Sequence, residues 1–247
     1  MSGHSKWATI RRDKEKNDSA RGATFSKLIK EITVAARMGG GDISSNPRLR
    51  TAISAAKAAN MPSTNVDRAI KKGTGELEGV NYDEITYEAY GPGGTAILIE
   101  AVTDNRNRTV GEIRHMISKN NGNLGETGSV AYMFQRRGVI SVLATGIDED
   151  SIMLASLDAG AEDVRLEGES YIVTTPSDQL ENVRTVLTTA GMTVESAEIQ
   201  MIPKNLIPVD ANGARANIKL METLEDHDDV QHVWSNFDIP DELMATL

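Results

Sequence analysis

The sequence predicts an α+β protein, in which an N-terminal three-helix domain precedes two α/β domains. Apolar residues recur at helical spacing between residues 25 and 72 and alternate at strand spacing from residue 82 onwards. Strand and helix patterns then follow the order βαββαβ between residues 138 and 203. Together the three patterns point away from an all-helical or an all-strand fold.

The composition is that of an ordinary globular protein. Of its 247 residues, 39% are hydrophobic and 25% are charged. No apolar run reaches the roughly 18 residues of a membrane span, and the polar N-terminus lacks the apolar core of a secretory signal. The absence of cysteine excludes disulfides, thiolate catalysis and cysteine zinc sites. These features fit a reducing compartment, and we expect no membrane partner.

The first domain, residues 1–80, combines a basic segment with three helices. Helical spacing predicts helices over residues 25–36, 47–59 and 64–72. Asn46 and Pro47 fit an N-cap and a first helical position. In the third helix, the basic side lies opposite the apolar side of Val66, Ala69 and Ile70.

Charge divides the chain into two unlike parts. Residues 1–80 hold 15 Lys and Arg against 8 Asp and Glu, whereas residues 81–247 hold 11 against 28. A net charge of +7 before a net charge of −17 predicts nucleic acid as the partner of the first domain. A solvated charged face is the structural alternative. The residues assigned to the nucleic-acid surface are Lys6, Trp7, Arg11, Arg12, Lys14, Lys16, Arg21, Lys27, Arg68, Lys71 and Lys72.

The second domain is expected to be discontinuous, formed by residues 81–137 and 204–247. Its first part predicts strands near 85–90, 95–102 and 129–134, with a GPGG turn at 91–94 and a helix over 109–122. Thr109 and Glu112 have the spacing of a capping box for that helix. Because this part lacks a last helix and strand, the C-terminal helix and strand are expected to complete it. The inserted third domain, residues 138–203, has the βαββαβ order of a ferredoxin-like fold.

Two arginines occupy the segment TDNRNRT (103–109), between a buried strand and a helix. In extended chain, Arg106 and Arg108 would share one face and suit a bidentate grip on phosphate or carboxylate. Acids nearby could instead pair with these arginines and fix the loop, and the residues leave both interpretations open. The predicted anion or partner loop comprises Asp104, Asn105, Arg106, Asn107 and Arg108.

The sequence offers no convincing catalytic or metal-binding motif. The segment LEDHDDVQH (224–232) gathers four acids around His227, yet His227 and His232 would face apart on a strand. We interpret it as a solvated acidic turn. We expect no catalytic residue, no metal and no cofactor, and a binding protein in preference to an enzyme. A phosphate-handling enzyme that uses Arg106, Arg108 and the turn at 91–94 is the less favoured alternative.

Nine separated motifs resemble the YebC family, whose eukaryotic relative is the mitochondrial translational activator of cytochrome oxidase subunit one. Ala89 departs from the family pattern, where glycine is usual. In chain order the motifs are GHSKWATI, FSKLIKEITVAAR, NPRLRTAI, NMPSTNVDRAIKKGTG, YEAYGPGGTAI, TDNRNRT, GSVAYMF, AGAED and LEDHDDVQ.

The resemblance implies a helical first domain, two ferredoxin-like domains and a cytoplasmic bacterial protein without enzyme activity or cofactor. It implies a probable transcriptional regulator that binds DNA. The alternative that it offers is a ribosome-associated translation factor, bound to ribosomal RNA, that relieves stalling or activates translation. Only two aromatic residues, Trp7 and Phe25, lie in residues 1–80. Sequence-specific readers of single-stranded RNA need a stacking platform, so this domain suits duplex DNA or structured RNA better.

Overall fold

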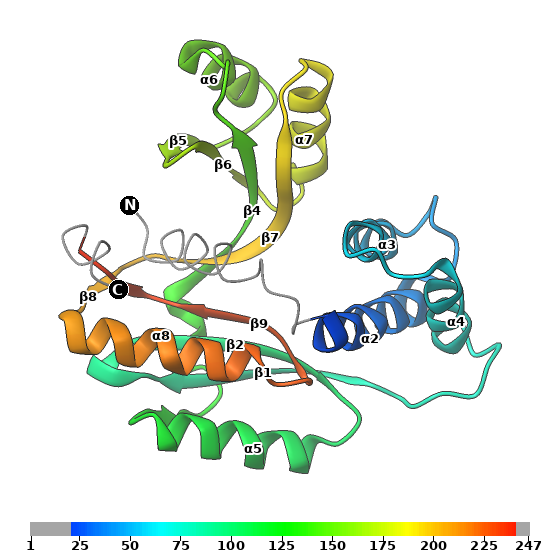
Figure 1. Ribbon diagram of the computed structural model, residues 1–247, viewed down its shortest axis with the longest axis vertical. Coiled ribbons are helices and arrows are strands. Elements are labelled where there is room, and N and C mark those ends of the chain that lie inside the picture. Colours follow the sequence, from blue (N-terminus) through cyan, green and yellow to red (C-terminus); the bar gives the residue numbers. More distant parts are fainter. Residues whose placement is uncertain (1–20, 241–247) are drawn as a thin grey trace. The chain divides into compact units, whose positions relative to one another are not determined.

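The computed structural model describes residues 21–240 (Figure 1). Contacts divide the chain into two compact units, one from Tyr132 to Leu206 and one that includes the residues on both sides of it. The first of these is called the inserted unit below, and the second is called the main unit. The boundaries of three separate domains stay a prediction, because the helices and the first sheet share the main unit. No helix within residues 21–240 is long and apolar enough to cross a membrane.

The main unit begins with the expected three helices, α2 (Arg21–Gly39), α3 (Pro47–Ala58) and α4 (Ser63–Gly73). Asn46 caps α3 as predicted, because its side-chain oxygen accepts the backbone N–H of Leu49. Helix α2 packs against both other helices. The core of this bundle is formed by Ile32, Ala35, Ala36, Leu49, Ala52, Ile53, Ala56, Met61, Val66 and Ala69.

The sheet of the main unit is antiparallel, in the order β3-β1-β2-β9. Helices α5 and α8 pack on the sheet face that carries Ile97 and Ile99. A short 3-10 turn at Pro92–Gly94 joins β1 to β2, and the buried Asn217 of α8 donates a hydrogen bond to the carbonyl of Pro92. The bounds are β1 (Asp83–Tyr90), β2 (Ala96–Thr103), α5 (Arg106–Lys119), β3 (Asn123–Leu124), α8 (Ala211–Glu225) and β9 (Val230–Ser235), with β8 (Ile207–Pro208) and β10 (Phe237–Asp238) as a separate pair.

The inserted unit has the predicted βαββαβ order and the antiparallel strand order β5-β6-β4-β7. This is the strand order of a ferredoxin-like fold, so the predicted fold class is confirmed. A core of Ile140, Val142, Ile152, Val173, Val183 and Leu187 lies between sheet and helices. The bounds are β4 (Phe134–Leu143), α6 (Glu149–Asp158), β5 (Asp163–Glu167), β6 (Ser170–Pro176), α7 (Leu180–Thr189) and β7 (Val194–Pro203).

The strand predicted over residues 129–134 is wrong. Residues 131–133 form a 3-10 turn, and β4 begins only at Phe134. The cause is the buried carboxylate of Glu88, which accepts the backbone N–H groups of Gly128, Val130 and Ala131 at 2.6–2.7 Å. These amides are therefore not available for a strand ladder. The short β3 takes the edge position beside β1 instead.

The capping box predicted at Thr109 and Glu112 is also wrong. Helix α5 begins three residues earlier, and Asn105 is its N-cap, with its side-chain oxygen accepting the N–H of Arg108 at 3.1 Å. Thr109 is fully buried one turn inside the helix, where its hydroxyl is within 2.8 Å of the Thr103 hydroxyl. Its polar group serves the packing of α5 on the sheet and does not cap the helix.

Candidate nucleic-acid interface

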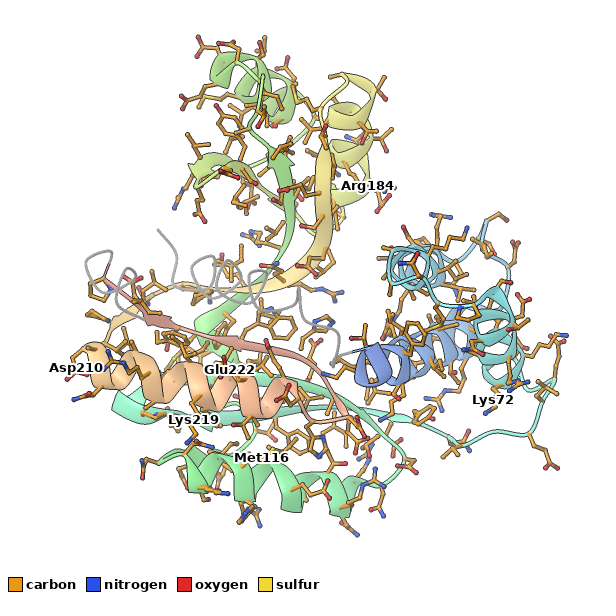
Figure 2. All side chains as sticks on the ribbon, in the orientation of Figure 1. Lys72, Met116, Arg184, Asp210, Lys219 and Glu222 are labelled. Atoms are coloured by element: carbon orange, nitrogen blue, oxygen red, sulfur yellow. The ribbon has the colours of Figure 1, made fainter. Side chains whose placement is uncertain are left out.

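Helix α4 presents the basic side that the sequence predicts. Val66 and Ala69 are buried against the bundle, while Arg68, Lys71 and Lys72 are exposed. Among the described residues, none of these three cations has a hydrogen bond or an ion pair to a protein group. Figure 2 labels Lys72 on α4, where its side chain extends from the helix. Three cations without protein partners on one helix side make a surface that can accept phosphates.

A structural explanation for part of this pattern is the helix dipole. Lys71 and Lys72 lie in the last turn of α4, where positive charge offsets the partial negative charge of the helix C-terminus. That effect is worth about 0.3–1 kcal/mol at an exposed site and does not need Arg68, which lies in the middle of the helix. The helix dipole therefore explains why Lys71 and Lys72 lie at this end of the helix. It does not explain why the basic side extends to Arg68.

Two cations of α2 are already held by protein groups. The ammonium of Lys27 donates to the carbonyl of Glu225, and the guanidinium of Arg37 donates to the carbonyl of Tyr82. The sequence predicts Lys27 on the nucleic-acid surface, whereas its ammonium contacts the C-terminal end of α8. The three cations of α4 thus differ from Lys27 and Arg37 of α2 in having no protein partner among the described residues.

Arg48 of α3 is also paired. Its guanidinium contacts Glu31 at 2.7 Å and Glu84 at 2.6 Å. The hydrogen bond that Arg48 donates to Glu31 is the main cause that raises the pKa of Arg48, with a smaller contribution from Glu84 and an opposing one from burial. This arginine ties the bundle to β1, and its charge is already compensated there.

The carboxylate of Asp229 is contacted by four side chains. Its side chain is 4% exposed and contacts the ammonium of Lys30 at 2.5 Å and the guanidinium of Arg108 at 2.8 Å. The hydroxyls of Thr109 and Thr103 donate to the same carboxylate at 2.7 and 3.1 Å. Burial raises the pKa of Asp229, but the hydrogen bonds from Lys30, Arg108 and Thr109 outweigh it and hold the pKa well below 3.8. The predicted solvated acidic turn is therefore wrong at this residue.

A groove of about 870 Å³ opens beside Asp229 and contains the best geometric candidate for a metal. One oxygen each of Glu112 and Asp229 and one nitrogen of His227 lie within 4.8 Å of one another. The His227 ring is already held at both nitrogens, by Glu112 at 2.8 Å and by the backbone N–H of Asp229 at 3.1 Å. A metal would have to approach a carboxylate that Lys30 and Arg108 already neutralise. The residues present therefore fit a buried ion-pair network better than a metal.

The arginine loop is helical, so the expected shared face of Arg106 and Arg108 is wrong. Both residues lie in the first turn of α5, where positions two apart point to different sides. Arg106 contacts Asp83 at 2.9 Å, and Arg108 contacts Asp104 at 2.7 Å in addition to Asp229. The alternative in which nearby acids fix the arginines matches these contacts. Asn107 is exposed between them.

The remaining predicted residues lie wholly or partly outside the described part of the chain. Arg21 opens α2, but its side chain lies outside the described part of the chain. The same holds for the whole of Lys6, Trp7, Arg11, Arg12, Lys14 and Lys16.

Comparison with known proteins gives the chain a family. Residues 5–76 match the model of the TACO1/YebC N-terminal domain, and residues 82–237 match that of the TACO1/YebC second and third domains. A probable transcriptional regulatory protein of Geobacter sulfurreducens is 56% identical over 247 residues, covering all of both chains. One of Desulfotalea psychrophila is also 56% identical, over 248 residues and 99% of its own length.

A solved structure agrees with the fold. The crystal structure of a conserved hypothetical protein of Aquifex aeolicus is 48% identical, with a TM-score of 0.83 over 92% of this chain and 93% of that one. Two family models together match most of the chain, and the relatives match along its full length. The chain therefore belongs to the TACO1/YebC family.

Proposed function

We propose that this protein is a nucleic-acid-binding regulator, of the transcriptional type that its relatives' names describe, and that α4 contacts the phosphate backbone. The relatives named above support the regulatory role. The N-terminal segment is basic, and we expect it to add phosphate contacts to those made by α4.

One observation carries the proposal. The cations of α2 and α3 discussed above are engaged by carbonyls and carboxylates, whereas Arg68, Lys71 and Lys72 have no such partner in residues 21–240. Side chains used in folding are seldom available for a ligand. The unengaged cations therefore mark the side of the bundle that is free for an anion.

The chemistry of these side chains favours phosphate contact over base reading. Lysine ammonium groups act as flexible point charges and carry little sequence information. Each phosphate that they neutralise releases counterions, so the logarithm of the affinity falls with the logarithm of salt by about 0.9 per contact. We therefore expect binding by α4 to depend strongly on salt and weakly on sequence.

The test replaces two of the cations in the full chain. With Lys71→Ala and Lys72→Ala together, binding to duplex DNA should weaken, and the salt slope should fall by about two units, one per lost contact. Fluorescence anisotropy with several unrelated sequences measures both quantities. The matched control is Lys119→Ala, because Lys119 is likewise an exposed lysine in the last turn of a helix. If the control lost as much affinity for DNA as the double variant, α4 would not be the phosphate-contacting helix.

The same titration separates the two kinds of nucleic acid. A duplex DNA and a folded ribosomal RNA fragment of equal phosphate number are compared at one salt concentration. Tighter binding to DNA supports the transcriptional role. Tighter binding to RNA supports the translation-factor alternative, with α4 keeping its role as the phosphate-contacting helix.

The proposal also treats the protein as a binding protein in preference to an enzyme. In the main unit Arg106 and Arg108 are held by Asp83, Asp104 and Asp229, so their guanidinium groups serve protein carboxylates. Incubation with nucleoside triphosphates and Mg²⁺ should give no turnover. Saturable turnover that disappears in Arg106→Ala would overturn this part of the proposal.

A further inference from the structure

The outward side of α6 in the inserted unit is apolar. Leu154 is 65% exposed, Leu157 is 47% exposed and Met153 is 37% exposed. Ile152 and Ser156 of the same helix are completely buried, so α6 has its core contacts on the opposite side. Large apolar residues thus face solvent where a surface helix normally carries polar ones.

The edge strand β5 extends the same surface. Leu166 is 53% exposed and pairs with Tyr171, whose ring belongs to the core on the helix-covered side of the sheet. Leu166 therefore lies on the sheet face that α6 covers, and α6 contacts β5 (Figure 1). We call the set of Met153, Leu154, Leu157 and Leu166 the α6 surface.

Acidic residues frame the α6 surface. Helix α6 contains Glu149, Asp150 and Asp158 and no Lys or Arg. At 100° per residue, Asp150 and Asp158 lie one turn before and after Leu154 on the outward side. The nearest arginine along β5, Arg165, is paired with Asp163 at 2.6 Å. Residues 132–206 as a whole hold 5 Lys and Arg against 12 Asp and Glu, a net charge of −7.

Single exposed apolar residues need no explanation, but neighbouring ones with a polar rim are typical of protein interaction sites. The charge of the rim decides among occupants. Nucleic acid and anionic lipid are repelled by it. A second copy in a two-fold interface would bring the same acids against one another. A partner that is both apolar and positively charged satisfies both features.

We propose that the α6 surface is a docking site for a Lys- and Arg-rich amphipathic segment of another protein. The partner's apolar side chains contact the leucines of α6, and its cations contact Asp150 and Asp158 at the rim. This site is independent of nucleic-acid binding by α4, so either can fail without the other. The molecule would then link a nucleic acid to a basic protein partner.

The test uses a defined probe and the full chain. The probe is a synthetic amphipathic helix of about five turns, or about 18 residues, with leucines on one side and lysines on the other. A peptide with glutamates in place of the lysines is the charge control. We expect the lysine peptide to bind and to shift the backbone NMR signals of α6 and β5, and the glutamate peptide not to bind.

Substitutions on the surface give the decisive comparison. Leu154→Ser with Leu157→Ser should weaken peptide binding by at least about tenfold, since two apolar side chains that the bound peptide would cover are lost. Asp150→Asn with Asp158→Asn should weaken it less and reduce its dependence on salt. The matched control is Leu77→Ser with Val80→Ser, because both residues are exposed apolar side chains of the main unit. Thermal unfolding verifies that each variant is folded.

Several outcomes would overturn the proposal. Binding that falls equally in the Leu154/Leu157 variant and in the Leu77/Val80 control would be non-specific attraction to an acidic protein. A dimer in sedimentation that dissociates in the Leu154/Leu157 variant would make a second copy the occupant. Displacement of the probe by a peptide of residues 1–20 would make this chain's own basic segment the occupant.

Discussion

At the scale of single residues, the carboxylate of Asp229, next to the start of β9, connects α2 and α5 through ion pairs. The carboxylate joins Lys30 and Arg108, which are 199 and 121 residues away in sequence. Sequence spacing carries no sign of such pairing, because each contact depends on the finished fold. The acidic run LEDHDD was visible, but which of its acids is buried was not.

Replacement of Asp229 by Asn should destabilise the protein by about 2–3 kcal/mol, somewhat less than the loss of a fully buried pair, because Arg108 is partly exposed and can regain water. Denaturant unfolding at pH 7 measures this loss. Asp228→Asn is the matched control, an exposed acid in the same turn, and should change the free energy of unfolding by less than about 0.5 kcal/mol. Equal effects of the two substitutions would contradict the role assigned to Asp229.

The low pKa of Asp229 also fixes how this effect depends on pH. Because the folded pKa is below the ordinary 3.8, the carboxylate stabilises the native state fully above that value. The stabilisation is lost as the pH falls from 3.8 toward the folded pKa. The difference between the native sequence and Asp229→Asn should therefore stay constant between about pH 5 and 8 and narrow at more acidic pH. If the difference in unfolding free energy between the two proteins narrowed near neutral pH, a group other than Asp229 would be responsible for the pH dependence.

At the scale of elements, the sequence predicts the α-helices and the longer strands, since periodicity and caps are local signals, but not the two-residue strands β3, β8 and β10. Helix α4 ends at Gly73 and α3 is capped by Asn46, as the residues indicated. The failures occurred where a tertiary contact overrode a local signal. Glu88 removed the backbone amides of a segment that reads as a strand, and Asn105 capped a helix for which Thr109 offered a closer match to a known motif.

The cap of α5 can be tested directly. Asn105→Ala should cost about 1 kcal/mol of unfolding free energy, because the N–H of Arg108 loses its acceptor. Asn105→Asp should keep most of the stability, since aspartate caps equally well. Asn107→Ala, at an exposed position inside the first turn, is the control and should be neutral or slightly stabilising. If Asn105→Ala left the free energy of unfolding unchanged, Asn105 would not be the stabilising N-cap and the prediction of Thr109 would be favoured again.

At the scale of the whole molecule, charge is divided unevenly along the chain. Composition alone predicted this division, since a net charge of +7 precedes one of −17. It could not predict which basic residues remain available, because the pairing of Lys30, Arg37 and Arg48 with residues in or next to β1 and β9 appears only in the fold. Nor could it predict the exposed leucines of α6, because an apolar helix pattern reads as core in a sequence.

If α4 and the α6 surface are separate sites, nucleic-acid binding and peptide binding should be independent of each other. The double variant Lys71→Ala/Lys72→Ala should lose nucleic-acid affinity and keep its affinity for the lysine peptide. Leu154→Ser/Leu157→Ser should do the reverse. In the quadruple variant the loss for each ligand, expressed as a free energy, should equal that in the corresponding double variant within about 0.5 kcal/mol, because the surfaces lie on different units and share no residue. Anisotropy with a labelled duplex and a labelled peptide gives all eight affinities. A coupling well above that limit would mean that one ligand alters the site of the other, and the two surfaces would then have to be treated as parts of one allosteric system.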